Sequence, residues 1–460
     1  MRNRHLQKRA IWILTAAAVA SFAASALAWV NPLEHRYLSG KPLEICDQGS
    51  FFVGGVPKIT PYAGSSTAGA PQQIIIGQMY VQFEIPKTRR KWPLVMVHGS
   101  SHTGAALEAT PDGREGWFPY AVRKNLATFV VDQPGRGRSG FDSTVVQEGK
   151  GTGNLDLIPG NWGRISDTAA WTFWFGHVIP AGTDVVTGTM IRHGDPGDPD
   201  PAEDVANPSH AHGNYPPAYP IPPIPNSTDP NLVARVGAIG PAPNAANHSY
   251  LGLEYYKQLV PNAEVTLPGS VCPTCVPTAV APANTWSPRA LAELVERLDG
   301  AILAGHSQAT DQVMHTVRIL KERGKLHLLK GIIIPEGRDT NLAAAGLTGS
   351  DFDRIPFLIV NTDFRALATR TLNRNDVAAM NASPTRSVGP ALAVDMDSAR
   401  FQGRFNGQTH MNMLDTTNLA LFDFFLEWAG ANIPNPVVAN RCASDRKETK
   451  AVRPRPASTR

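Results

Sequence analysis

A serine stands at the turn between an apolar run and a helical pattern, in the segment Gly305-His306-Ser307-Gln308-Ala309. The apolar run covers Ala301 to Ala304, and the helical pattern begins near Gln308. In a strand-to-helix turn of this kind the serine backbone is strained, so the residues two before and two after it must be small, as Gly305 and Ala309 are. The turn also directs the N–H groups of the helix N-terminus at a developing oxyanion. The pattern predicts that Ser307 is a nucleophile for acyl transfer.

A second turn, His98-Gly99-Ser100-Ser101, directly follows the apolar run Leu94 to Val97. A His-Gly turn at this position of a sheet usually supplies another oxyanion N–H group. We expect that group on Ser100, paired with the N–H of Gln308. The imidazole of His98 itself is expected to be structural.

A nucleophilic serine needs a base, and the candidates from the turn onward are His306, His315, His327 and His410. The first lies inside the turn with its side chain directed away from the nucleophile, the second is in mid-helix, and the third precedes a strand. His410 lies in the polar segment Asn406 to Met411, after the last predicted strand and before a helix predicted from Thr416 to Glu427. This placement follows the chain order Ser, acid, His and predicts that His410 is the general base.

Two carboxylates could orient the base. Glu336 ends the apolar run Gly331 to Ile334, and Asp363 ends the next one, Phe357 to Val360. Both positions lie at C-terminal strand ends, where a side chain can reach the imidazole. In most α/β-hydrolases the acid follows the later strand, which favours Asp363.

Other acidic residues and cysteine pairs are expected to have no catalytic or metal-binding role. Asp132 begins a turn rich in Pro and Gly that leads out of a strand, so it is expected to determine the fold rather than to react. Cys272-Pro-Thr-Cys275 lies in a Pro-rich loop and favours a local disulfide over a zinc or redox pair. An acidic cluster lacks the regular ligand spacing of a calcium site and is expected to be a solvated loop: Asp195, Asp198, Asp200, Glu203 and Asp204. No cofactor or metal is implied.

Short, fully apolar runs alternate with helical patterns from Trp92 onward. The runs are Leu94–Val97, Thr128–Val131, Ala301–Ala304, Gly331–Ile334 and Phe357–Val360. Continuous apolar runs indicate strands buried on both faces, and therefore a mostly parallel sheet covered by helices, of the α/β class. Helices are predicted at Pro288–Leu298 and Gln308–Glu322, and leading antiparallel strands at Ser50–Val53 and Gln73–Ile85.

The alternation breaks between Gly140 and about Val280. Residues 196 to 230 contain eleven prolines, which exclude a regular helix or a central strand there. The aromatic residues upstream of the prolines indicate that the first half packs onto something: Trp162, Trp171, Phe173, Trp174 and Phe175. A long irregular insertion of this kind is typical of a lid over an active site, with a structural subdomain as the alternative.

The first residues combine basic side chains with an apolar run, Ala10 to Ala24, and end in the small-x-small segment Ala26-Leu27-Ala28. This pattern predicts a cleaved secretory signal and a secreted or periplasmic protein. Cleavage after Ala28 removes four positive charges from a formal net charge of +4. The nearly neutral remainder indicates neither a nucleic-acid partner nor stable membrane insertion. The four cysteines should be oxidised in that compartment, with Cys46 paired to Cys442 if Cys272 pairs with Cys275.

Five pieces of the chain together resemble a small group of secreted bacterial α/β-hydrolase esterases. They are Ser50-Phe51-Phe52-Val53-Gly54-Gly55, Gly77-Gln78-Met79-Tyr80-Val81, His98-Gly99, Gly305-His306-Ser307-Gln308 and Thr409-His410-Met411. In that group the acid is a Glu after the strand that follows the nucleophile, so the resemblance implies a triad of Ser307, Glu336 and His410. The group has adjacent cysteines after the His-Gly turn, where this chain has Ser100-Ser101.

We expect an α/β-hydrolase fold whose substrate is a small-molecule ester. The expected parts are a signal peptide (1–28), two halves of the hydrolase domain (29–140 and 281–440), a Pro-rich insertion or lid (141–280) and a disordered basic tail (441–460). The same site could act on a lactone or an amide. A non-catalytic binding protein on a hydrolase scaffold is the competing class, and the oligomeric state stays open.

Overall fold

The structure is a computed structural model. It describes residues 39–40, 42–111, 113–154, 157, 170, 174–181, 184–192, 255–261, 286–338, 340–362, 364–365, 367–439 and 442. The expected signal peptide, the proline-rich stretch 196–230, Cys272, Cys275 and the acidic cluster lie outside the described residues, as does the basic tail apart from Cys442. None of the helices in the described ranges has the length and apolar character that a membrane span requires.

A sheet of eight strands forms the centre of the molecule, in the order β1-β2-β5-β4-β8-β9-β10-β11. The strands β5, β4, β8, β9, β10 and β11 run parallel, whereas β1 and β2 join one edge antiparallel. Their bounds are β1 (Ile45–Thr60), β2 (Gln72–Pro86), β4 (Leu94–Val97), β5 (Thr128–Asp132), β8 (Ala301–Gly305), β9 (Leu329–Pro335), β10 (Phe357–Asn361) and β11 (Leu392–Asp395). The expected α/β class, with a mostly parallel sheet, is confirmed.

Two separate hydrophobic cores cover the two faces of the sheet. Successive residues of β4 alternate between them: Val95 and Val97 belong to one core, and Leu94 and Met96 to the other. This alternation follows from the two-residue repeat of a strand, which points neighbouring side chains to opposite faces. Because every residue of β4 is buried, the strand reads as a continuous apolar run.

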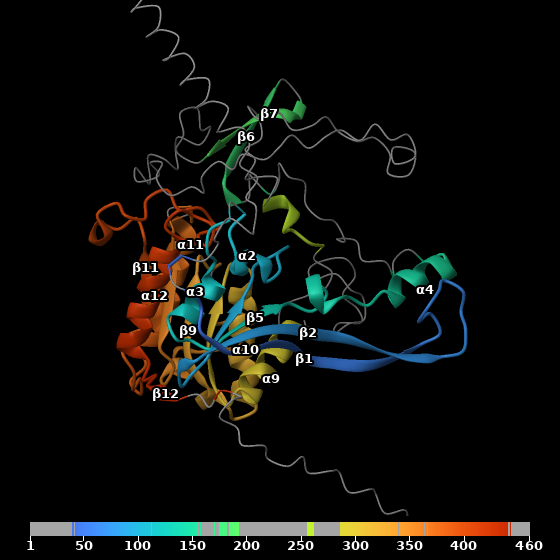
Figure 1. The fold of residues 1–460 in the computed structure, drawn as a ribbon, viewed down its shortest axis with the longest axis horizontal. Coiled ribbons are helices and arrows are strands. Elements are labelled where there is room, and N and C mark those ends of the chain that lie inside the picture. The colour runs from blue at the N-terminus through green and yellow to red at the C-terminus, as the bar shows by residue number, and fades with distance from the viewer. Residues whose placement is uncertain are drawn as a thin grey trace, which may run out of the picture.

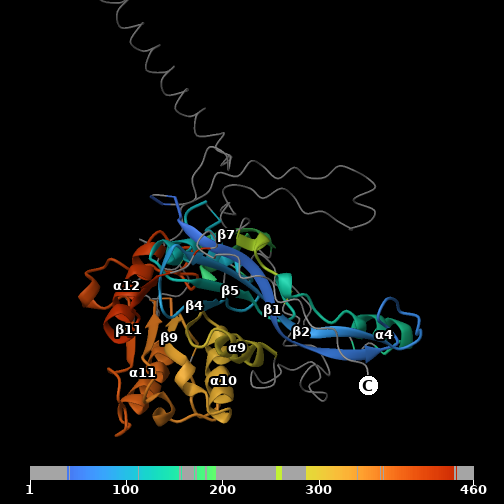
Figure 2. The same ribbon diagram turned by 60° about the horizontal axis from the view of Figure 1, so that its bottom comes forward.

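Helices α9 (Trp286–Arg297), α10 (Ala309–Glu322) and α11 (Leu367–Asn381) contribute to the first core, and α2 (Ala105–Glu108), α3 (Trp117–Arg123) and α12 (Asn418–Asn432) to the second. Figures 1 and 2 show α9 and α10 grouped together, and Figure 2 shows α11 and α12 apart at the other end of the sheet, with β11 between them. In α10 the fully buried residues Val313, Val317 and Leu320 recur at the spacing of one helix face.

The remaining elements are short. They are β3 (Thr88–Arg90), which pairs with β12 (Val437–Ala439), the hairpin of β6 (Gly176–Ala181) and β7 (Asp184–Arg192), helix α4 (Thr144–Thr152), and 3₁₀ turns at Gly137–Ser139, Leu326–Leu328, Gly349–Phe352 and Ala399–Phe401. The long ribbon of β1 and β2 projects from the body of the molecule, and α4 lies at its far end (Figure 1).

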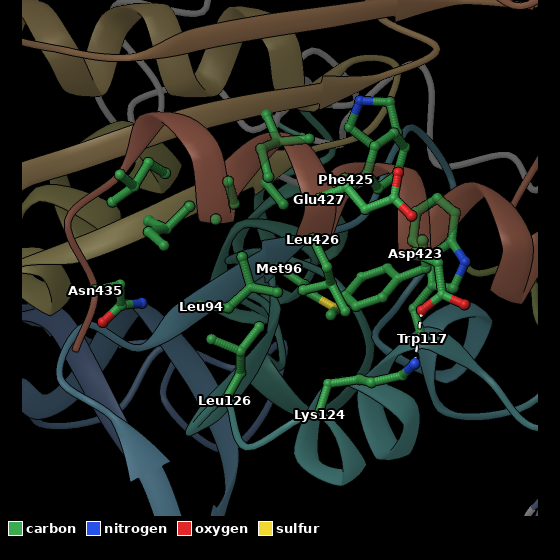
Figure 3. A pocket seen from close by; sticks show the side chains of 18 of the residues that line it. Leu94, Met96, Trp117, Lys124, Leu126, Asp423, Phe425, Leu426, Glu427 and Asn435 are labelled. Carbon is green, nitrogen blue, oxygen red and sulfur yellow. Dashed lines mark ion pairs between the residues drawn. The ribbon is translucent and has the colours of Figure 1, made fainter. Parts of the chain in front are cut away.

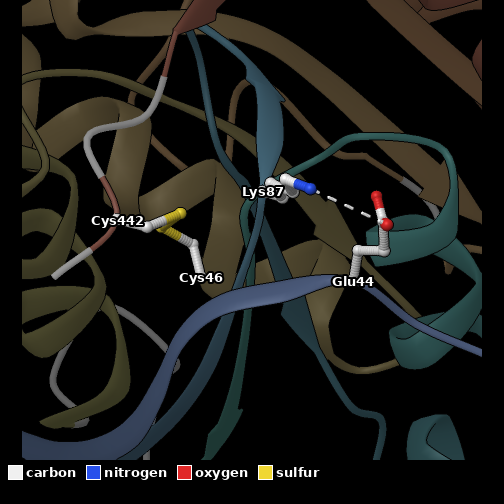
Figure 4. Close-up of a disulfide and its surroundings, with 4 residues drawn as sticks. All are labelled: Glu44, Cys46, Lys87 and Cys442. Atoms are coloured by element: carbon white, nitrogen blue, oxygen red, sulfur yellow. Dashed lines mark ion pairs between the residues drawn. A yellow bond between two sulfur atoms is a disulfide. The ribbon is translucent and has the colours of Figure 1, made fainter. Parts of the chain in front are cut away.

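A disulfide joins Cys46 at the start of β1 to Cys442, which follows β12 (Figure 4). The two residues are 396 positions apart in the chain, and their Cα atoms are 5.1 Å apart. The expected bond between the two ends of the domain is thereby confirmed.

Several expected boundaries need correction. The helix predicted from Thr416 to Glu427 spans Asn418–Asn432, because turns continue from Met411 to Thr417 before it begins. The strand Phe357–Val360 is not the last of the sheet, since β11 pairs parallel with β10. Only Val394 of β11 is buried, although Ala391 to Val394 form an apolar run as long as those of the other strands.

Candidate active site

Ser307 lies in the turn that joins the end of β8 to the start of α10. Its φ of 55° lies in the left-handed region, which a residue with a side chain adopts at a cost. A Cβ atom on Gly305 would lie 2.7 Å from Cγ2 of Val313 and 3.0 Å from the carbonyl oxygen of Ala309, so a larger residue would push the helix away. The turn is therefore the strained strand-to-helix geometry that the sequence predicts.

His410 contacts the serine directly. Its Nε2 atom is 2.8 Å from Oγ of Ser307, and its side chain is buried. The backbone of His410 is fixed on both sides, because its carbonyl oxygen is 2.8 Å from Nε2 of His306 and its N–H donates to the carbonyl oxygen of Trp174 at 3.2 Å. Asp415 holds the preceding turn by accepting hydrogen bonds from the backbone N–H and the hydroxyl of Thr409.

Glu336 lies on the other side of the imidazole and is fully buried. Its Oε1 atom is 3.5 Å from Nδ1 of His410. Its Oε2 atom accepts a hydrogen bond of 2.6 Å from the backbone N–H of Thr362, at the end of β10. Glu336 also has a positive φ, of 53°, directly after β9. The structure thus brings Ser307, His410 and Glu336 together, whereas Asp363 lies outside the described residues.

An arginine completes the cluster, and the sequence did not indicate it. Nε of Arg365 donates to Oε1 of Glu336 at 2.9 Å, and its Nη2 is 2.9 Å from Nδ1 of His410. Burial holds the pKa of His410 well below its ordinary value, and the positive charge of Arg365 lowers it further. In the sequence, Arg365 is distinguished only by its position shortly after the predicted strand Phe357–Val360 and the candidate acid Asp363.

The turn His98-Gly99-Ser100-Ser101 lies against the nucleophile. A Cβ atom on Gly99 would be only 2.9 Å from Cβ of Ser307, so the backbone approaches the serine more closely than any other residue would permit. The buried guanidinium of Arg136 ties this turn to the start of α10, donating to the carbonyl oxygen of Gly99 at 3.0 Å and to Oε1 of Gln308 at 2.7 Å. Ser100 and Gln308, whose N–H groups are the expected oxyanion donors, thus belong to the two backbone segments next to Ser307.

The imidazole of His98 is structural, as expected. Its Nδ1 is 2.8 Å from the carbonyl oxygen of Gly99, and its Nε2 accepts the backbone N–H of Gln133 at 3.1 Å. Burial and the neighbouring Arg136 lower the pKa of His98 to about 3, so the ring stays neutral.

Asp132 also serves the fold. Its carboxylate accepts hydrogen bonds from the backbone N–H groups of Gly104 and Arg138 and from the Arg138 side chain. These bonds close the turn that follows β5.

The described part of the insertion packs beside the site. Nε2 of His102 is 2.5 Å from the hydroxyl of Tyr255, and the His102 ring meets that of Trp174 edge-on at 5.1 Å. The N–H of Val260 donates to the carbonyl oxygen of Ser101 at 2.9 Å. Residues from both sides of the proline-rich stretch therefore contact the turn after β4, in agreement with the expectation that the insertion packs onto the domain.

A cavity of about 440 Å³ lies between the sheet and α12 (Figure 3). The residues that line this cavity are mostly apolar and include Met96, Trp117, Leu126 and Phe425. Of the residues from Gly305 to Ala309, His306 lines this cavity and Ser307 does not. Within the ranges that the structure describes, no group of three or more His, Cys, Asp or Glu residues could hold a metal ion.

Comparisons with known proteins agree with an enzyme that acts on esters. No family model matches the chain. A solved structure of a bacterial esterase is similar in fold, with a TM-score of 0.58 and 25% sequence identity, over 86% of this chain and 99% of the esterase. A fungal protein named "Probable secreted lipase phiG" is 32% identical over 62 residues, which are 13% of this chain and span 17% of the lipase.

Proposed function

We propose that this protein is an exported serine hydrolase of the α/β-hydrolase fold that cleaves carboxylic esters. The observation that carries the proposal is the contact of 2.8 Å between Nε2 of His410 and Oγ of a serine in a strained strand-to-helix turn. A strained, buried serine beside an imidazole lowers the stability of the fold, and this is the arrangement that nucleophilic acyl transfer requires. The similarity to a bacterial esterase over most of both chains supports the same class.

In the proposed mechanism His410 takes the proton of Ser307 as its oxygen attacks the ester carbonyl. The backbone N–H groups of Ser100 and Gln308 would hold the oxyanion. His410 then gives the proton to the departing alcohol, and an acyl-enzyme remains. A water molecule, deprotonated in turn by His410, releases the acid and restores the serine. Glu336 would hold the proton of Nδ1 and stabilise the imidazolium that forms in each step.

Glu336 is the proposed acid because its carboxylate is fully buried and faces Nδ1. The same site could open a lactone or cleave an amide, since the attacking group and the oxyanion donors would be shared. Export is supported by the disulfide between Cys46 and Cys442, because such bonds persist in oxidising compartments. We also propose that the insertion 141–280 is a lid, since its described residues Trp174 and Tyr255 cover the turn after β4.

Hydrolysis of aryl esters with acyl chains of graded length tests the proposal. The wild-type chain should hydrolyse at least the short esters, and Ser307→Ala should lose about four or more orders of magnitude in turnover while keeping its melting temperature. The control is Ser65→Ala in the turn between β1 and β2, whose exposed hydroxyl is hydrogen-bonded to Thr67. A folded wild-type protein that cleaves none of the esters would instead favour the non-catalytic binding protein.

A further inference from the structure

Arg365 lies between the two groups that the proposed mechanism joins. Its Nε donates to Oε1 of Glu336 at 2.9 Å, and its Nη2 is 2.9 Å from Nδ1 of His410. Oε1 itself is 3.5 Å from Nδ1, which exceeds the length of an ordinary hydrogen bond. Oε1 of Glu336 is therefore hydrogen-bonded to Arg365 rather than to His410.

This arrangement fixes the tautomer of His410. A guanidinium has five N–H donors and no acceptor, so its contact with Nδ1 is a hydrogen bond only when Nδ1 carries a lone pair. The single proton of the neutral imidazole is then on Nε2, where it faces Oγ of Ser307 at 2.8 Å. An Nε2 that carries a proton cannot accept the proton of the serine. In this state the ring is held in the tautomer that cannot act as a base.

Activation requires that Arg365 leave Nδ1. Once it does, the imidazole can carry its proton on Nδ1, donated to Glu336, and present the lone pair of Nε2 to Ser307, with no change in its total protonation. Leaving Nδ1 also breaks the hydrogen bond of 3.4 Å from Nη2 to the carbonyl oxygen of Glu336. The side chain is nevertheless 15% exposed and, among the described residues, its Nη1 atom has no hydrogen-bond partner, so the guanidinium can bind a group from solvent. Its backbone is anchored, since its carbonyl oxygen accepts a hydrogen bond of 2.7 Å from Nε of the buried Arg370.

Separating a guanidinium from a buried carboxylate is costly unless another anion replaces that partner. A carboxylate on the substrate would do so, because it matches the planar guanidinium in two parallel hydrogen bonds. An uncharged ester offers no such compensation. We propose that Arg365 recognises a carboxylate on the substrate, and that the preferred substrates are esters bearing a negative charge, which draw the guanidinium from His410 and so activate the site. This inference rests on the proposed ester hydrolysis.

Two pairs of esters test it, each differing only in a carboxylate or its methyl ester. One pair carries the group in the acyl part, as 4-nitrophenyl hydrogen succinate and 4-nitrophenyl methyl succinate. The other carries it in the alcohol part, as 3-carboxyphenyl acetate and 3-(methoxycarbonyl)phenyl acetate. The measured quantity is the ratio of kcat/KM for the charged and the methylated ester, taken in the wild type and divided by the same ratio in Arg365→Gln. Intrinsic reactivity cancels in this comparison.

The expected quotient is about 30 or more in at least one pair, the size of a lost charge-assisted hydrogen bond. The loss of kcat/KM in Arg365→Gln should be larger for the charged ester than for the methylated ester by this factor. Arg338→Gln is the matched control, since Arg338 is an exposed arginine two residues after Glu336 that pairs with Asp311. The same quotient, calculated with Arg338→Gln in place of Arg365→Gln, should be near one.

A quotient near one for Arg365→Gln in both pairs would overturn the inference and leave Arg365 as a support for Glu336. Equal loss of activity on charged and methylated esters would have the same meaning. If the variant fails to fold, the wild type alone still tests the inference. Its kcat/KM values are then divided by the rates of alkaline hydrolysis of the same esters. A wild type that favours neither member of either pair after this correction also contradicts the inference. Absence of any Ser307-dependent hydrolysis would instead reject the proposed function itself.

Discussion

Glu336 accepts a hydrogen bond from Arg365 and faces the imidazole of His410, and its substitution should therefore affect both turnover and stability. Glu336→Gln removes the charge that would stabilise the imidazolium, so we expect turnover to fall by about 10⁴-fold. It also leaves the guanidinium of Arg365 without its carboxylate partner, so the melting temperature should fall by several degrees. Steady-state kinetics and thermal unfolding measure the two effects.

Asp363→Asn is the matched control for the acid, because it removes the other carboxylate at a strand end. It should keep most of the activity of the wild type. A dead Asp363→Asn variant beside an active Glu336→Gln variant would transfer the role of the acid to Asp363.

The pH dependence of kcat/KM reports the pKa of His410 in the free enzyme. Burial and the charge of Arg365 hold that pKa well below its ordinary value of 6.5. The base is therefore deprotonated at neutral pH, and the acid limb for an uncharged ester should lie well below pH 6.5. Arg365→Gln removes one of the two causes and should move this limb to higher pH. An unchanged limb would mean that the guanidinium does not act on His410 in solution.

The sequence identified the serine and the histidine of the cluster because each stands in a recognisable local pattern. Ser307 follows an apolar strand and precedes a helix, and His410 occupies the polar loop before the last helix. The residues alone do not decide between Glu336 and Asp363, because each follows one of two neighbouring apolar runs, and only the resemblance favours Glu336. Arg365 could not be identified, because no sequence pattern predicts that a loop side chain will lie between the carboxylate of Glu336 and the imidazole of His410.

At the scale of the elements, the turn after β4 must approach the turn after β8 closely enough to place a backbone N–H beside the serine. Gly99→Ala tests this approach, because the new Cβ would lie 2.9 Å from both Cβ of Ser307 and Nδ1 of His306. Displacing the turn by a fraction of an ångström should lower kcat/KM by about 10²-fold with a small change in melting temperature. Gly64→Ala is the control, since a Cβ there meets nothing within 4 Å. Full activity of Gly99→Ala would remove the turn from the proposed site.

The buried strands were predictable because their apolar runs are short and end in turns. The first of the five runs coincides with β4, and the other four lie within β5, β8, β9 and β10, which extend one to three residues further. β11 is not among the predicted strands, although Leu392, Ala393 and Val394 are apolar, so the same pattern could have identified it. Helix α12 begins two residues later than predicted, because Thr416 and Thr417 lie in a turn, and it ends five residues later, at Asn432.

At the scale of the whole molecule, several neutral histidines are buried around the site, and they link its stability to pH. Burial lowers the pKa of His98, His102 and His306 to about 3 each. In the unfolded chain each would bind a proton below about pH 6.5. The unfolded state therefore binds more protons between these values, so stability is complete above pH 6.5 and is lost as the pH falls.

The expected loss is up to about 1.4 kcal/mol per pH unit for each histidine, or about 4 kcal/mol for the three. Urea unfolding at pH 7.5, 6.0 and 5.0 measures it, in a range where most carboxyl groups of the unfolded chain stay ionised. His306→Asn should reduce the slope by about one proton whatever its effect at pH 7.5. A free energy of unfolding that stays constant from pH 7.5 to 5.0 would show that these rings are protonated or exposed in the folded protein.

The central claim is that His410 activates Ser307 as a nucleophile. A fluorophosphonate reacts covalently with an activated serine and releases fluoride, so the mass of the intact protein reports it directly. We predict that prolonged incubation, during which Arg365 leaves Nδ1 transiently, gives one adduct per chain of folded wild-type protein. The adduct should map to Ser307 by peptide analysis, with none on Ser307→Ala and strongly slowed labelling of His410→Ala. Folded wild-type protein that gains no adduct, or an adduct that persists in Ser307→Ala, would contradict the account.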